Sequence, residues 1–129
     1  MEIKRVDHIA VNTIDFKQSI CFYRDLLGFK QLGTVDMGDF TITYLELPGG
    51  GRLELFDYRG GNKSCERAES EAGLRHLAFE VDDVRKHEEI LRAADVKIIL
   101  TTTELPPLGA RVLLFVDPNG VTLEFCEKL

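Results

Sequence analysis

The stretch "HIAVNTIDF" at residues 8–16 returns as "HLAFEVDDV" at residues 76–84, 68 positions further along the chain. Each copy begins with a histidine, an aliphatic residue and an alanine, and ends with an aspartate followed by an apolar residue. A second match places "LEL" (residues 53–55) 70 positions before "LEF" (residues 123–125). Two matches with nearly the same spacing indicate that the chain contains a duplicated structural module.

Each copy is predicted to run through a strand, a helix and three further strands, because patterns with a period of two residues flank one helical pattern. The first copy predicts a helix of about 12 residues capped by Asp15 and strands at 4–12, 29–36, 40–47 and 51–57. The second predicts a helix capped by Asp82 or Asp83 at 83–94 and strands at 74–81, 96–102, 110–117 and 120–127. This order of elements predicts an α+β fold built from two βαβββ modules.

The length and the charge of the chain limit what it can be. Its 129 residues suit one domain, with module 1 at about 1–57, a linker at 58–73 and module 2 at about 74–129. The net charge of −6 argues against a nucleic-acid-binding surface. The apolar runs are too short to cross a membrane, and the N-terminus lacks the pattern of a signal peptide. We therefore expect a cytoplasmic protein that binds neither nucleic acid nor membranes.

Four ionisable side chains are expected on the strand faces that do not cover the helices. Side chains alternate between the two faces of a strand, so His8 lies opposite the apolar residues at 9 and 11, and Glu54 lies opposite those at 53 and 55. His76 and Glu124 hold the equivalent positions in the second copy. If each sheet curves away from its helix, these faces line a cup.

Two imidazoles and two carboxylates form a plausible metal site, since these donors suit zinc, nickel, cobalt, manganese or iron(II). A single histidine in a strand is more often structural, and a single glutamate in a strand usually faces solvent. The repetition of both residue types at the same positions favours the metal site. A metal with four protein ligands can still accept water or substrate when its coordination expands.

The other reactive side chains have simpler interpretations. The three cysteines are odd in number and widely spaced, so Cys21, Cys65 and Cys126 do not predict a disulfide framework. Cys21 is expected in the core, and Cys126 is expected to fill space beside the cup. His87 lies in a charged helical segment and is expected to be solvated. The charged residues 66–73 are expected to form an exposed linker.

Four segments carry a family resemblance. They are "DHIAVNTIDFKQSICFYRDLLGFK" (7–30), "RLELFDY" (52–58), "GLRHLAFEVDDV" (73–84) and "VLLFVDPNGVTLEF" (112–125). Together they resemble the vicinal oxygen chelate superfamily, and within it the glyoxalase I group. The resemblance implies two βαβββ modules that form a curved mixed sheet around a metal-binding cup.

The resemblance also implies a site and a reaction. The metal ligands would be His8, Glu54, His76 and Glu124, with the first two from one subunit of a homodimer and the last two from its partner. The implied chemistry is proton transfer next to a metal-bound carbonyl of a small 2-oxo or hemithioacetal substrate, with stabilisation of the resulting enediolate. Glu124 would act as the catalytic base with Glu54 as its counterpart, and residues 103–110 are a candidate closing loop.

This sequence departs from the glutathione-binding pattern of that group. Asn12 stands where an arginine is usual, Tyr58 stands where an asparagine is usual, and the loop before the seventh strand is Pro106–Leu108 rather than basic. The resemblance therefore implies a glyoxalase I-like lyase without implying lactoylglutathione lyase activity. Another anionic substrate could be held by arginines, which more commonly lie at the rim; the candidates are Arg52, Arg75 and Arg111.

Three other functions within the superfamily remain open. An acyl-CoA epimerase usually has glutamine at the second ligand, and an iron(II) dioxygenase needs a triad of two histidines and one carboxylate, so Glu54 disfavours both. A drug-binding or ligand-binding protein of the bleomycin-resistance type usually lacks the ligands. The presence of all four disfavours that non-enzymatic function.

Overall fold

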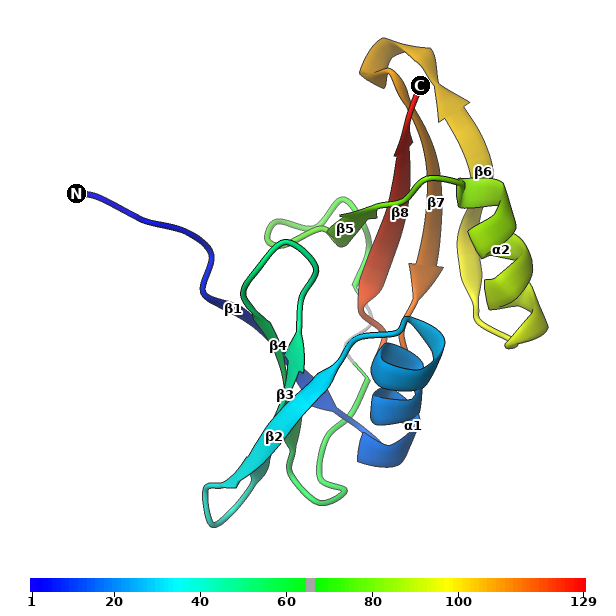
Figure 1. The fold of residues 1–129 in the computed structure, drawn as a ribbon. Helices are drawn as coiled ribbons and strands as arrows, with labels where there is room; N and C mark the ends of the chain where they lie inside the picture. Colours follow the sequence, from blue (N-terminus) through cyan, green and yellow to red (C-terminus); the bar gives the residue numbers. More distant parts are fainter. Residues whose placement is uncertain (65–66) are drawn as a thin grey trace. The chain divides into compact units, whose positions relative to one another are not determined.

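The computed structural model describes residues 1–64 and 67–129, and the chain divides into two compact units at residues 1–64 and 65–129. Each unit holds one four-stranded mixed sheet and one helical segment (Figure 1). The predicted α+β class and the two βαβββ modules are confirmed. Residues 58–64 and 67–73 form turns and irregular chain, whereas the expectations for Cys65 and Glu66 lie outside the described residues.

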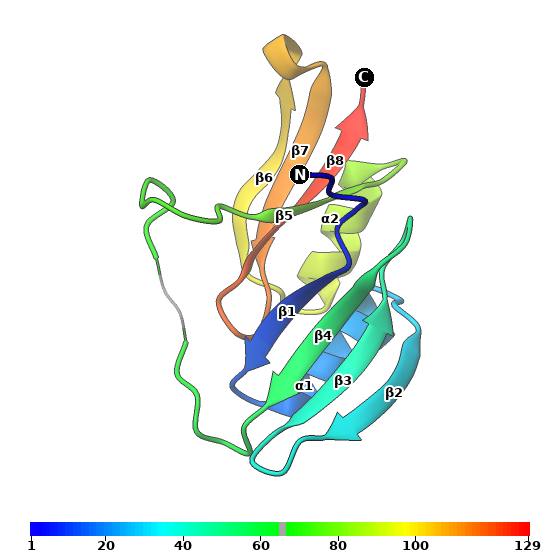
Figure 2. The ribbon, with the colours of Figure 1, turned by 90° about the vertical axis from the view of Figure 1, so that its left-hand side faces the viewer.

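The first unit has its elements in the order strand, helix and three strands. They are β1 (His8–Thr13), α1 (Phe16–Ile20), η1 (Cys21–Leu26), β2 (Gln31–Asp36), β3 (Thr41–Glu46) and β4 (Arg52–Asp57). The strand order is β1-β4-β3-β2, in which β1 and β4 are parallel and the other pairs are antiparallel. Figure 2 shows α1 behind this sheet, so one face of the sheet packs on the helix.

The helical segment of this unit changes its winding after one turn. Asp15 caps α1 as predicted, since its carboxylate accepts a hydrogen bond from the Gln18 amide at 3.2 Å. The chain then continues as the π-helix η1, in which the Leu27 amide donates to the Phe22 carbonyl. Residues 19–20 and 22–23 are buried, whereas Cys21 is exposed. The prediction that Cys21 lies in the core was wrong, because Cys21 lies on the side of the helical segment opposite these buried residues.

The second unit repeats the order of elements. They are β5 (Leu77–Glu80), α2 (Val84–Ala93), β6 (Ile98–Leu105), η2 (Pro106–Leu108), β7 (Ala110–Val116) and β8 (Thr122–Lys128). The strand order is β5-β8-β7-β6, with β5 and β8 parallel. Asp83 rather than Asp82 caps α2, because its carboxylate accepts a hydrogen bond from the Lys86 amide.

The segment predicted as a closing loop is largely a hairpin. Residues 103–105 extend β6 and pair with residues 110–112 of β7. Only the short 3₁₀ turn η2 and Gly109, which has a φ of 59°, join the two strands. A positive φ at this position favours glycine because it has no Cβ. Residues 103–110 are therefore tied to the sheet along half of their length, which corrects the prediction of a free loop.

His87 is less exposed than predicted. Its ring packs edge-to-face against Phe125 of β8, with 5.2 Å between the ring centroids. Its Nδ1 also lies 2.6 Å from the Asp83 carbonyl oxygen, one turn earlier in α2. The prediction of a solvated side chain was wrong in that His87 is half-buried with its ring against the sheet, whereas the charged residues Arg85, Lys86 and Glu89 are exposed.

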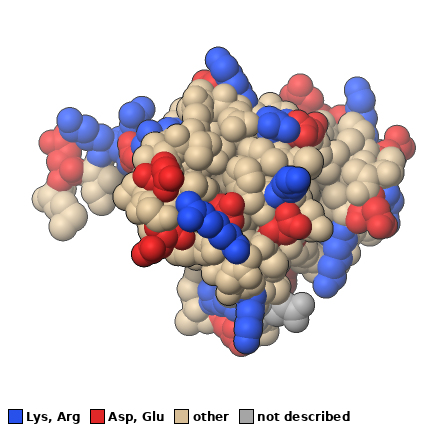
Figure 3. Space-filling model, turned by 90° about the horizontal axis from the view of Figure 1, so that it is seen from below, with Lys and Arg blue, Asp and Glu red and all other residues tan. Residues whose placement is uncertain are grey.

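Charged side chains of both signs lie on the face of the molecule that Figure 3 draws. On the face drawn in Figure 3, the described lysines and arginines lie among aspartates and glutamates. Among the described residues, no helix is long and apolar enough to cross a membrane.

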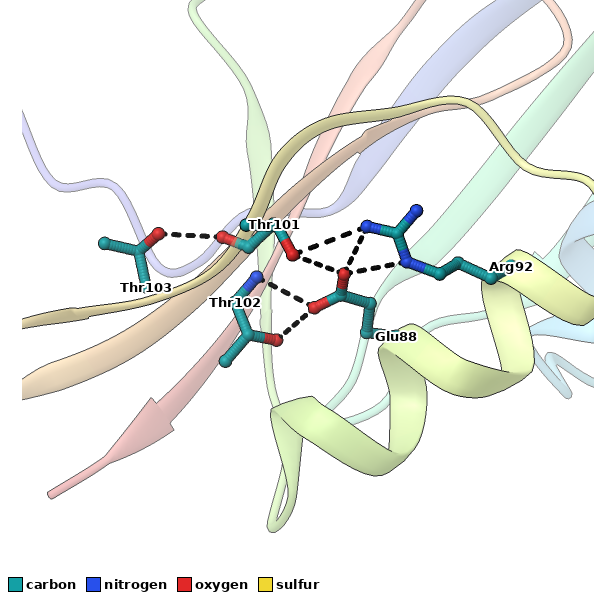
Figure 4. A network of polar contacts seen from close by, with 5 residues as sticks. All are labelled: Glu88, Arg92, Thr101, Thr102 and Thr103. Carbon is teal, nitrogen blue, oxygen red and sulfur yellow. Dashed lines mark hydrogen bonds and ion pairs between the residues drawn. The ribbon is translucent and has the colours of Figure 1, made fainter.

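A polar network fastens α2 to β6. The Glu88 carboxylate accepts hydrogen bonds from the hydroxyls of Thr101 and Thr102, from the Thr102 amide and from the Arg92 guanidinium (Figure 4). These donors lower the pKa of Glu88 to about 2, with the threonine hydroxyls as the largest cause. Since ionised Glu88 is buried, its charge is stabilised almost entirely by these groups.

We predict that Glu88→Gln lowers the free energy of unfolding by about 2–3 kcal/mol at pH 7, because a neutral amide cannot accept the same set of hydrogen bonds. A lowered pKa stabilises the folded state fully above the unfolded-state value of 4.5 and progressively less as the pH falls to about 2. The difference between variant and wild type should therefore shrink over this window in urea titrations. Glu89→Gln, at an exposed neighbouring position, is the control. A difference that is absent at pH 7, or constant down to pH 2.5, would contradict this role.

Candidate metal centre

The first candidate half-site joins the two strands that pair in parallel at the edge of the first sheet. In β1, residues 9, 11 and 13 turn inward while His8, Ala10 and Asn12 are exposed, which confirms the predicted faces. Ala10 is in register with Glu54 of β4, so the glutamate lies on the face of His8. The Nε2 atom of His8 lies 3.7 Å from Glu54 Oε2. Glu54 is only 6% exposed, which makes its carboxylate costly to bury without a partner.

His8 is oriented by the carboxylate of Asp7, a residue that was not among the predicted site residues. Asp7 Oδ2 lies 2.8 Å from His8 Nδ1, and this contact lowers the pKa of Asp7, with a smaller contribution from the charge of Arg52. A carboxylate on one ring nitrogen favours a proton there and leaves the other nitrogen free to bind a metal. The sequence signal was present, because the aspartate directly precedes the histidine.

Arg52 lies beside the same glutamate. Its guanidinium is 3.7 Å from Glu54 Oε1 and 3.6 Å from Asp7 Oδ2. It also lies over the ring of Tyr44, with 4.7 Å between Cζ and the ring centroid. Tyr44 is in register with Glu54 across the β3–β4 pair, so the three side chains share one face of the sheet.

The second half-site repeats this arrangement in the second unit. His76 directly precedes β5, because the strand begins at Leu77 rather than at residue 74 as predicted. Its Nε2 atom lies 3.3 Å from Glu124 Oε2 of β8, and Ala78 is in register with this glutamate. The Nδ1 atom of His76 is buried and has no hydrogen-bond partner among the described residues. The two half-sites therefore share the histidine, the alanine and the glutamate but differ in what orients the imidazole.

Each predicted histidine thus lies beside the predicted glutamate of its own module. Within residues 1–64 and 67–129, no group of three or more histidines, cysteines, aspartates and glutamates has the arrangement of a metal site. Each half-site therefore offers two donors. Cys126 is half-buried, as expected for a space-filling residue, and follows Glu124 on the same face of β8.

Two of the three arginines considered for an anionic substrate are held by carboxylates. Arg111 lies 2.6 Å from both Glu104 and Glu127, contacts that raise its pKa and lower that of Glu104. Arg75 lies 3.0 Å from Glu69. In the part of the chain that the structure describes, Arg52 makes the longer carboxylate contacts given above, so its N–H groups are the more available.

Comparisons with known proteins place this chain in a family. The sequence profile of the Glyoxalase/Bleomycin resistance protein/Dioxygenase superfamily matches residues 5–125. YaeR of Escherichia coli (strain K12), described as uncharacterized, is 35% identical over 98% of both chains. A lactoylglutathione lyase of Haemophilus influenzae is 31% identical, covering 94% of this chain and 90% of that one.

A solved structure is also similar. The trypanothione-dependent glyoxalase I of Leishmania major matches with a TM-score of 0.74 and 28% identity, over 98% of this chain and 88% of that one. The profile match spans both βαβββ modules and all four candidate ligands. The chain therefore belongs to the Glyoxalase/Bleomycin resistance protein/Dioxygenase superfamily, the vicinal oxygen chelate superfamily.

Proposed function

We propose that the chain is a metal-dependent lyase or isomerase that moves a proton next to the metal-bound carbonyl of a small 2-oxo or hemithioacetal substrate. The observation that carries this proposal is the duplicated half-site, in which Nε2 of a histidine faces a glutamate carboxylate at 3.7 Å in one module and 3.3 Å in the other. The similarity to a lactoylglutathione lyase and to a glyoxalase I supports the reaction class.

The donor atoms fit a divalent metal. Two ligands of one ion, each at about 2.0–2.2 Å, lie roughly 3.0–3.5 Å apart. The His76–Glu124 separation of 3.3 Å falls within this range, and the His8–Glu54 separation of 3.7 Å is close to it. We assign all four side chains as ligands of one ion, for which zinc, nickel, cobalt and manganese suit the two nitrogens and two oxygens.

Different side chains have different roles in the proposed proton transfer. A bound divalent metal would polarise the substrate carbonyl and so acidify the neighbouring C–H group. Glu124 takes the proton, because its side chain is 16% exposed against 8% for Glu54 and is therefore freer to move towards substrate. Glu54 is proposed as its counterpart in the first half-site. Asp7 holds His8 in the tautomer that presents Nε2.

The active protein is proposed to be a homodimer. The His8–Glu54 half-site of one subunit would complete its ligand set with the His76–Glu124 half-site of its partner. Each half-site supplies only two donors, and a twofold-symmetric pair of chains would make two identical sites.

We predict that His76→Ala reduces the zinc or nickel content of purified protein by at least about tenfold, because one ligand is lost and Glu124 is left unpaired. His87→Gln is the matched control, since His87 is the one remaining histidine and contacts Phe125 and the backbone instead. Elemental analysis after dialysis against each metal provides the measurement. Equal metal content in wild type and His76→Ala would refute the metal assignment.

Mixing two variants that each lack one proposed metal ligand tests whether the site spans two subunits. His8→Ala and His76→Ala each remove one ligand from every site of their own homodimers. Unfolding and refolding them together should restore metal binding to about a quarter of the sites, because half of the dimers are mixed and each mixed dimer has one intact site. Each variant refolded alone is the control. Metal content that stays at the level of the separate variants would place all four ligands in one chain.

We predict that Glu124→Gln lowers kcat by about 10²–10⁴-fold while the protein still binds metal, because the amide oxygen can remain a ligand but cannot accept the proton. Methylglyoxal with glutathione, and then with other thiols, provides the substrates, and product formed in D₂O should contain deuterium only with wild type. Glu127→Gln is the control, since Glu127 lies on the same strand and pairs with Arg111. Metal-loaded wild type that turns over none of these adducts would exclude hemithioacetal substrates.

A further inference from the structure

Because the module is duplicated, the sheet face that carries Glu54 can be compared with the sheet face that carries Glu124. With the glutamates aligned, β4 presents Arg52, Glu54 and Phe56 where β8 presents Thr122, Glu124 and Cys126. Across the neighbouring strand, Tyr44 faces Glu54 while Leu114 faces Glu124. The second module folds into the same sheet without a cation or an aromatic ring at these positions. The fold therefore does not require Arg52, Tyr44 or Phe56.

The guanidinium of Arg52 is held in place, but its N–H groups are not fully used in hydrogen bonds. The ring of Tyr44 supports its guanidinium from one side. Its two carboxylate contacts, at 3.6 Å and 3.7 Å, are longer than hydrogen bonds. Its side chain is 43% exposed. An oxyanion that approaches beside Glu54 would therefore meet an arginine that is already oriented and still has N–H groups to donate.

An aromatic cluster continues the same face on the other side of Glu54. Phe56 stacks on Phe40 with 5.5 Å between centroids, and Phe40 packs on Tyr58 at 4.9 Å. The rings are tilted by only 20° and 31° from one another, and Tyr58 is 40% exposed. Since the Phe56 and Tyr58 centroids are also only 6.4 Å apart, the three rings form a triangular cluster, in which the exposed ring of Tyr58 offers a surface to another planar group.

From this order we infer that the first module selects a compact anion with a planar aromatic group, its oxyanion on Arg52 and its ring against the Phe40–Phe56–Tyr58 cluster. Positions 52, 54 and 56 of one strand lie about 6.6 Å apart in succession. Positions 52 and 56 are therefore about 13 Å apart, which the Arg52 side chain, reaching to within 3.7 Å of Glu54, and a small aromatic acid can bridge together, with the oxygens of the acid beside Glu54. The inference rests on the proposed function, because it names the substrate class of the same site.

The test uses three probes that separate charge from ring. Phenylacetate has both features, acetate lacks the ring, and phenylacetamide lacks the charge. Calorimetric titration of zinc-loaded and metal-free protein gives the affinities, and the NMR signal of the Arg52 Nε–H group reports where the anion binds. We expect phenylacetate to bind at least about tenfold more tightly than either other probe.

Three variants assign the preference to residues. Arg52→Gln should remove the advantage of phenylacetate over phenylacetamide, and Tyr58→Leu should remove its advantage over acetate. Arg24→Gln should change neither, and its side chain, 42% exposed, matches Arg52 in exposure within the same unit. Circular dichroism and the unfolding midpoint confirm that each variant is folded.

The outcomes distinguish this inference from the proposed function. If zinc binds but Arg52→Gln leaves phenylacetate affinity unchanged, or acetate binds as tightly as phenylacetate, the inference is overturned and the metal site stands. If zinc does not bind, the proposed function fails. In that case the affinities of metal-free protein test the inference. It is overturned if Arg52→Gln leaves phenylacetate affinity unchanged or if acetate binds as tightly as phenylacetate.

Discussion

The candidate site depends on the parallel pairing of the first and last strands in each module. Parallel neighbours in register present their side chains on the same face, so a histidine near the start of one strand meets a glutamate of the other. A shift by one residue would turn the histidine or the glutamate towards the helix. The apolar residues on the opposite face, Leu53 and Leu55 in β4 and Leu123 and Phe125 in β8, are buried and hold this register.

Much of this arrangement could be predicted from the sequence, because it follows from local patterns. A period of two residues fixes which side chains share a face, and it placed His8 with Glu54 and His76 with Glu124. The helix starts could be predicted for the same reason, since Asp15 and Asp83 bond to amides three residues away. Because the module is duplicated, each of these predictions could be made at two separate places in the chain.

The features that could not be predicted depend on partners distant in the sequence or on an unusual backbone. The π-helical turn η1 is not revealed by side-chain periodicity, whereas the exposure of Cys21 follows from its position opposite the buried residues 19–20 and 22–23. His87 and Glu88 were part of a charged helical segment in the sequence, yet one packs on Phe125 and the other is enclosed by threonines of β6. The Arg52–Tyr44 contact joins two strands whose register had to be known first.

Ala10 and Ala78 lie in register with the two glutamates, and both are exposed. The methyl side chain of an alanine extends only a short way from the sheet. Ala10 and Ala78 therefore do not fill the space beside each histidine–glutamate pair. Replacing either alanine with leucine would close that space with hydrocarbon, while the buried residues that hold the strands would stay as they are. Single changes at these two positions would thus replace the candidate site face with an apolar face, while the βαβββ modules would keep their fold.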